Sequence, residues 1–73
     1  MTERAQHLAW CRQRALEILD GGDKIAAVTS LMSDLLKHDK TLPTVPIVRR
    51  SVSVQLHGTA QEIRAFIEDC TET

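Results

Sequence analysis

The stretch Asp20-Gly21-Gly22-Asp23 lies between two segments in which apolar residues recur every three or four positions. That spacing is typical of amphipathic helices that bury one face. A glycine in the left-handed conformation can end the first helix, and Asp23 can cap the amides that begin the second. Because the link is so short, the helices are expected to run antiparallel as a hairpin. The recurring residues are Leu8, Cys11, Ala15, Ile18 and Leu19 before the link, and Ile25, Val28, Leu31, Met32, Leu35 and Leu36 after it.

This first hairpin is predicted to occupy residues 2–38, with Thr2 as the first N-cap and a second helix running from Asp23 to about His38. A proline-rich link is expected at 39–46, because Pro43 and Pro46 favour an extended backbone there.

The segment 47–56 fits two periodicities. Val48, Val52 and Leu56 share one helical face, whereas Val52, Val54 and Leu56 alternate with polar residues as in a strand. A strand in this segment would have to pair with a second chain, since an unpaired strand is not stable alone. The helical interpretation is preferred because the neighbouring segments are helical.

A second hairpin is expected at 47–70. Gly58 is placed to end its first helix, and Thr59 and Glu62 have the spacing of a capping box that begins the next. The prediction is an all-α fold, a single domain at 1–73 in which four short helices form two antiparallel hairpins, a small helical bundle.

The chain has 73 residues, and a domain of this size buries only about 60% of the surface of its unfolded chain. Trp10 and Phe66 are its only Phe, Tyr or Trp residues, so aliphatic side chains must fill the core. Four helices this short leave apolar surface uncovered, which makes a homodimer a plausible way to complete the core.

The formal net charge is −1, which does not favour a dedicated nucleic-acid binder. The one compact pair of basic residues is Arg49-Arg50. It belongs either to a solvated polar face of a helix or to a site that contacts phosphate or an acidic protein surface. A small nucleic-acid-associated regulator that uses Arg12, Arg14, Arg49 and Arg50 is the alternative function. No apolar run approaches transmembrane length and no signal-peptide pattern is present, so no membrane association is expected.

Cysteine and histidine residues give no motif for catalysis or metal binding. His7 and Cys11 are four residues apart on one helix face, but His38, His57 and Cys70 do not follow at the spacing of a zinc site. The two thiols are interpreted as reduced side chains in the core. The expectation is therefore a protein that is not an enzyme and needs no cofactor or metal.

Trp10 lies about 100° around the first helix from its apolar stripe. It is either a rim residue of the core or an anchor in a partner's pocket, a role in which Trp is over-represented. The predicted partner-binding residues are Trp10, Arg14, Arg49 and Arg50.

The sequence also resembles a family of small phage proteins with no described activity. The resemblance covers residues 5–38, including the run Ala5-Gln6-His7-Leu8-Ala9-Trp10-Cys11, and, to a lesser degree, residues 59–68. This sequence differs from the family at Pro43, Pro46 and Arg49-Arg50, where the family has a long apolar helix. The resemblance implies a phage origin and intracellular action, but no known activity. Taken with the candidate residues above, it leads to the predicted function of a non-enzymatic, phage-encoded interaction module that binds a host or phage protein in the host cytoplasm.

Overall fold

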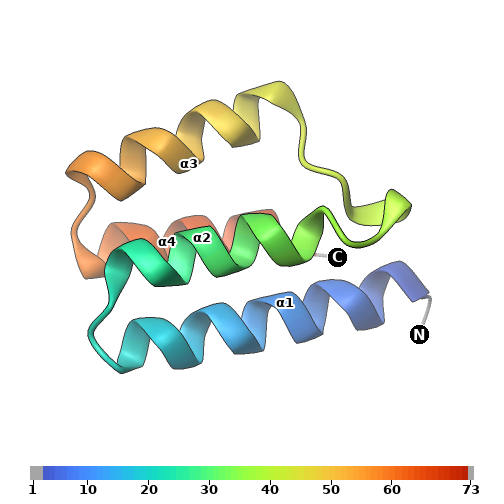
Figure 1. The fold of residues 1–73 in the computed structure, drawn as a ribbon, viewed down its shortest axis with the longest axis horizontal. Helices are drawn as coiled ribbons and strands as arrows, with labels where there is room; N and C mark the ends of the chain where they lie inside the picture. Colours follow the sequence, from blue (N-terminus) through green and yellow to red (C-terminus); the bar gives the residue numbers. More distant parts are fainter. Residues whose placement is uncertain (1–2, 73) are drawn as a thin grey trace.

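The computed structural model describes residues 3–72, which form four α-helices and no strand (Figure 1). The all-α prediction is confirmed, and the segment 47–56 is helical. The predicted N-cap Thr2 lies outside the described residues. The elements are α1 (Glu3–Asp20), α2 (Lys24–Leu35), the 3-10 helix η1 (Asp39–Thr41), α3 (Val45–His57) and α4 (Ala60–Cys70).

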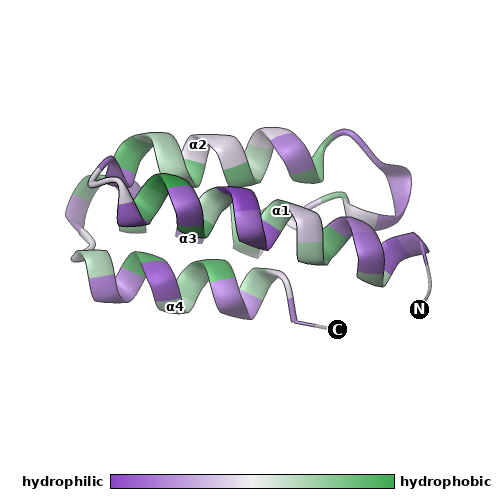
Figure 2. Cartoon of the chain, turned by 90° about the horizontal axis from the view of Figure 1, so that it is seen from below, coloured by the Kyte–Doolittle hydropathy of each residue, from purple (hydrophilic) through white to green (hydrophobic). Residues whose placement is uncertain are grey.

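Consecutive helices run in opposite directions along the long axis of the molecule (Figure 1). Seen from below, α2 and α4 lie above and below α1 and α3 (Figure 2), so α1 and α3 occupy opposite sides of the bundle. The core comes from α1, α2 and α4 and is aliphatic apart from one ring and one thiol. Its buried residues are Leu8, Cys11, Ala15, Leu19, Ala27, Val28, Leu31, Leu35, Ile63, Phe66 and Ile67.

The predicted turn between the first two helices is confirmed. Gly22 has a φ of 97°, the left-handed conformation that glycine adopts without a steric penalty. The amide of Ala26 donates to the Asp23 carboxylate at 2.9 Å, so Asp23 is the N-cap of α2. The largest helix–helix contact of the described chain, between α1 and α2, follows from this turn.

Two predicted boundaries are wrong. Helix α2 ends at Leu35 and not at His38, because the Thr41 hydroxyl donates to the Leu35 carbonyl at 2.8 Å and the chain turns into η1. Helix α3 begins at Val45, inside the predicted link. Pro46 lies in its first turn, where the missing N–H of proline leaves no helical hydrogen bond unmade.

The start of α4 is as predicted. The Glu62 amide donates to the Thr59 hydroxyl and the Thr59 amide donates to the Glu62 carboxylate, both at 3.2 Å, which makes a complete capping box. Gly58 ends α3 where its Cα lies close to the backbone of Val54. A Cβ atom at this position would lie 2.5 Å from the Val54 carbonyl oxygen. This close approach requires glycine.

The apolar stripe of α2 is less buried than the sequence indicates. Ile25 and Leu36 were expected on the buried face of α2, but each is 61% exposed. Helix α3 packs along α2 without covering them, and Ser51 is the only α3 residue that is fully buried. None of the described helices is long and apolar enough to cross a membrane.

Candidate functional site: the Trp10 cluster

Trp10 lies at the rim of the core on α1 and is 42% exposed. His7, one helical turn before it, stacks on the indole with ring centroids 5.5 Å apart. Arg14 follows one turn after it, with the guanidinium carbon 4.8 Å from the ring centroid. The Lys37 ammonium approaches the same ring from beyond the end of α2, at 5.6 Å. The indole is therefore held by neighbours on both sides along the helix.

Asp34 fixes the two cations. Its side chain is buried in α2 and accepts from Arg14 Nε at 2.8 Å and from Lys37 Nζ at 3.0 Å. Burial raises the pKa of this carboxyl, but the hydrogen bonds and charges of Lys37 and Arg14 outweigh burial, so the pKa is lowered below its ordinary value of 3.8. The carboxylate thus stays ionised and keeps both cations against Trp10.

Two histidines complete this arrangement. His7 Nε2 donates to the backbone carbonyl of Asp34 at 2.8 Å. The ring of His38 lies 5.4 Å from that of His7, and His38 Nδ1 accepts from the Lys40 amide at 3.2 Å. We call the set His7, Trp10, Arg14, Asp34, Lys37 and His38 the Trp10 cluster.

The geometry of the cluster limits what Trp10 can bind. His7 and Arg14, one turn before and one turn after Trp10, both contact the indole ring. A nucleic-acid base stacks on an exposed aromatic ring, whereas a protein pocket receives a tryptophan as a buried anchor. A fixed indole that is 42% exposed, with two neighbouring cations, suits a protein pocket with acidic groups at its rim.

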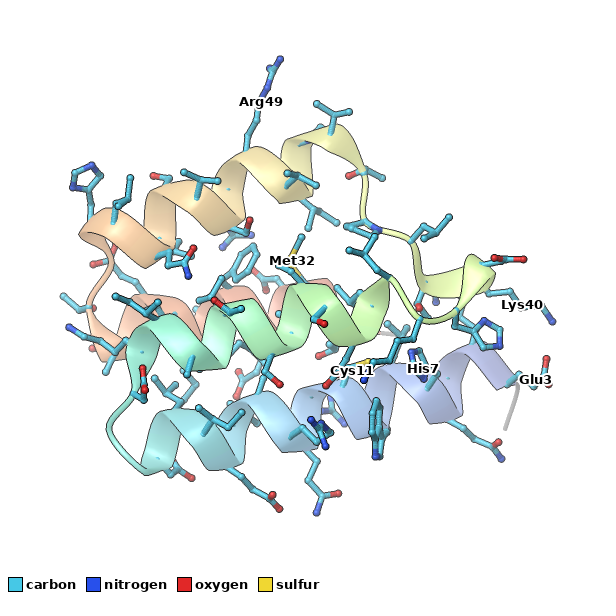
Figure 3. All side chains as sticks on the ribbon, in the orientation of Figure 1. Glu3, His7, Cys11, Met32, Lys40 and Arg49 are labelled. Carbon is cyan, nitrogen blue, oxygen red and sulfur yellow. The ribbon has the colours of Figure 1, made fainter. Side chains whose placement is uncertain are left out.

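The other two predicted partner-binding residues lie elsewhere. Arg49 projects away from the bundle on α3 (Figure 3). Arg50 donates to the Asp69 carboxylate at 3.1 Å, and its guanidinium carbon lies 5.3 Å from the centroid of the Phe66 ring. Since α1 and α3 are on opposite sides of the bundle, the structure does not bring these arginines together with Trp10 and Arg14 (Figures 1 and 2).

The thiols are placed as core side chains. Cys11 is fully buried and Cys70 partly buried, and neither forms a disulfide. Burial raises the pKa of both thiols to about 11, with the Asp34 carboxylate adding to the shift at Cys11. A nucleophilic cysteine needs a lowered pKa, so neither thiol has the properties of a catalytic nucleophile. Among residues 3–72, no three His, Cys, Asp or Glu side chains lie together as a metal site would require.

Sequence reasoning missed Asp34. Its three-residue spacing to Lys37 was a local signal, but its pairing with Arg14, 20 residues away, depends on the packing of α1 on α2. Sequence reasoning also missed a groove of about 440 Å³ between α2 and α3. The groove is lined by Val28, Met32, Leu36, Pro43, Val48 and Ser51, together with Thr29, Ser33 and Gln55. Met32 projects into the space between the two helices (Figure 3). The shared helical face of Val48, Val52 and Leu56 was the available signal for an apolar surface here.

Comparison with known proteins identified no relative. No protein-family model matches the chain, and no match was found among curated proteins or among solved structures.

Proposed function

We propose that this chain is a non-enzymatic protein-interaction module, encoded by a phage, that binds a host or phage protein in the host cytoplasm and also associates with itself. Trp10 and Arg14 form its partner-binding surface. Arg49 and Arg50 are on the opposite side of the bundle and are not part of this surface.

The observation that carries the proposal is the fixed position of a large, partly exposed indole. Ordering a free tryptophan at an interface has an entropic cost, and a side chain that is already held avoids most of it. Here the buried Asp34 carboxylate holds Arg14 and Lys37, and these cations hold the indole. The phage origin and the cytoplasmic setting are supported by the sequence resemblance over residues 5–38.

The nucleic-acid alternative gains no support from the geometry. Arg14 is paired with Asp34 and Arg50 with Asp69, so part of their charge is neutralised. The four arginines of that hypothesis are divided between α1 and α3, on opposite sides of the bundle. A nucleic-acid-binding domain typically carries its basic residues as a patch or stripe on one face.

The test is affinity capture from host lysate with immobilised wild-type chain, Trp10→Ala and Gln13→Ala. Gln13 is an exposed residue of the same helix whose side chain bonds to Glu17, so its truncation is the matched control. Loss of a hot-spot tryptophan is expected to weaken capture by at least about tenfold, since such residues contribute about 2 kcal/mol or more. Gln13→Ala is expected to capture the same protein as wild type.

Circular dichroism separates this result from unfolding. A 42% exposed Trp10 predicts that Trp10→Ala keeps its helical signal and a cooperative melt. A fully buried tryptophan would instead cost about 3–5 kcal/mol on truncation and unfold so small a domain. Equal capture by all three proteins, or recovery of DNA or RNA in place of a protein, would contradict the proposed function.

A further inference from the structure

Helix α3 carries an aliphatic stripe that faces solvent. Val45, Val48, Val52 and Leu56 follow one another at intervals of three or four residues, and they are 64%, 43%, 51% and 70% exposed. The opposite side of α3 makes the contacts with the bundle, through the buried Ser51 and the partly buried Ile47 and Val54. The helix is thus apolar on its outer side as well as on its packed side.

The stripe is continuous with the groove between α2 and α3, because Val48 belongs to both. On the α2 side the exposed Leu36 lines the groove, and Ile25 lies near its other end, where Gln55 of α3 donates to the Ile25 carbonyl at 3.3 Å. None of the described residues that line the groove has an ionisable side chain, although 26% of the whole chain is charged. An occupant of the groove is therefore apolar and uncharged where it makes contact.

The exposed area is close to what one stable interface needs. Full burial of an aliphatic side chain removes roughly 100 Å² of apolar surface from water. Six such side chains at 43–70% exposure, two from α2 and four from α3, offer on the order of 400 Å². A standard interface buries about 800 Å² on each partner, of which about 60% is apolar. The α2–α3 face alone supplies most of that apolar share.

The shape of this face suits contact with an identical face. A two-fold contact requires one surface to complement itself, and here a ridge (the α3 stripe) lies beside a hollow (the groove). With the two-fold axis at Val52 and the α3 helices antiparallel, Val48 of each copy lies opposite Leu56 of the other. The two Arg49 side chains are then offset by about 9 Å along the helix axis and do not face each other.

We infer that the α2–α3 face, made by the groove and the α3 stripe, is where a second copy of this chain binds. The inference rests on the proposed function, of which self-association is one part, and it assigns that part to a face to which α1 contributes none of the named residues. The Trp10 cluster therefore stays free for its own partner in the dimer.

The experiment is sedimentation equilibrium of the full chain between about 5 and 500 μM. Wild type is expected to dimerise within this range. Val52→Glu puts a charge at the proposed two-fold axis and is expected to weaken dimerisation by at least tenfold. The matched control is Ser53→Glu, which adds the same charge at the next exposed residue, about 100° around α3 and outside the stripe. Both residues are exposed, so circular dichroism should show both variants folded.

A second pair of variants tests the register. Val52→Cys is expected to form a disulfide-linked dimer on mild oxidation, whereas Ser53→Cys should remain mostly uncrosslinked. Cys11 and Cys70 are fully and partly buried with raised pKa values, so they react slowly by comparison. Crosslinking that follows Val52 alone supports the two-fold arrangement.

Three results would overturn the inference: a wild-type chain that is monomeric at 500 μM, a dimer that survives Val52→Glu, and a monomer whose groove takes up a fatty acid instead. The proposed function has a separate readout. Capture that is lost with Trp10→Ala and kept with Val52→Glu upholds the Trp10 surface whatever the sedimentation result. If the chain dimerises but Trp10→Ala does not change capture, the results support the α2–α3 face and not the Trp10 surface.

Discussion

Helices α2 and α3 lie side by side and have almost the same length, 12 and 13 residues, yet they are buried to very different extents. Helix α2 buries five residues, including Leu31 and Leu35. Helix α3 buries only Ser51 and leaves its aliphatic stripe in solvent. An apolar stripe therefore shows that a helix has a face to cover, but not that its own chain covers it.

The two edges of α2 differ in the same way. On the α1 side, a polar network around the buried Asp34 carboxylate joins the helices and holds Trp10. On the α3 side, the helices enclose an uncharged groove. The first edge presents a fixed aromatic and two cations, and the second presents aliphatic surface, so the two edges suit different partners.

The largest expected effect contrasts the two helices directly. Leu31→Ala on α2 removes a side chain with no exposed surface and is expected to cost about 2–5 kcal/mol of unfolding free energy. Val52→Ala on α3 removes a half-exposed side chain, and for the monomer it is expected to cost less than about 0.5 kcal/mol. Urea denaturation at a concentration below dimerisation measures both. Similar losses for the two variants would show that α3 is as firmly packed as α2.

A smaller effect is expected at the α1 edge of α2. Asp34→Asn removes the charge that pairs with Arg14 and Lys37 at pH 7. Because both cations are about half exposed and water can solvate them, the expected cost is only about 1–3 kcal/mol. Glu68→Gln, which neutralises an exposed carboxylate of α4, is the control and should be nearly neutral.

The stability difference between wild type and Asp34→Asn is expected to depend on pH. The pKa of Asp34 is lower in the folded chain than the ordinary value of 3.8. Its contribution to stability is then fully present above about pH 5 and is lost as the pH falls through the folded-state pKa, below 3.8. The difference between wild type and Asp34→Asn should be constant from pH 7 to 5 and should shrink in more acidic solution. A difference that grows on acidification would contradict the assignment.

Features set by neighbouring residues were predictable from the sequence. The Gly21-Gly22 turn, the Asp23 cap and the Thr59–Glu62 capping box are local hydrogen-bonding and backbone preferences, and the structure has all three. Boundaries that depend on distant residues were not predictable. The early end of α2 depends on Thr41, six residues beyond Leu35. Pro46 was expected to lie in an extended link, but the first turn of a helix accepts proline, and Pro46 lies in the first turn of α3.

The candidate site was predicted only in part. Trp10 was recognisable from its place beside the apolar stripe, and Arg14 lies next to it as expected for residues one turn apart. The Asp34–Arg14 pair forms through the packing of α1 on α2, which no local pattern encodes, whereas the three-residue spacing of Asp34 and Lys37 is a local signal. The separation of Arg49 and Arg50 from this cluster has the same origin, since it follows from the positions of α1 and α3 in the bundle.

Hydrogen exchange of the backbone amides at two protein concentrations tests the contrast between α2 and α3 most directly. In dilute solution, amides in the middle of α2 should exchange slowly, at rates set by global unfolding, and those of α3 should exchange faster through local opening. At a concentration that favours the dimer, α3 amides should gain protection while α1 amides near Trp10 gain none beyond the global increase. Equal protection of α2 and α3 in dilute solution, with no concentration dependence at α3, would contradict the account.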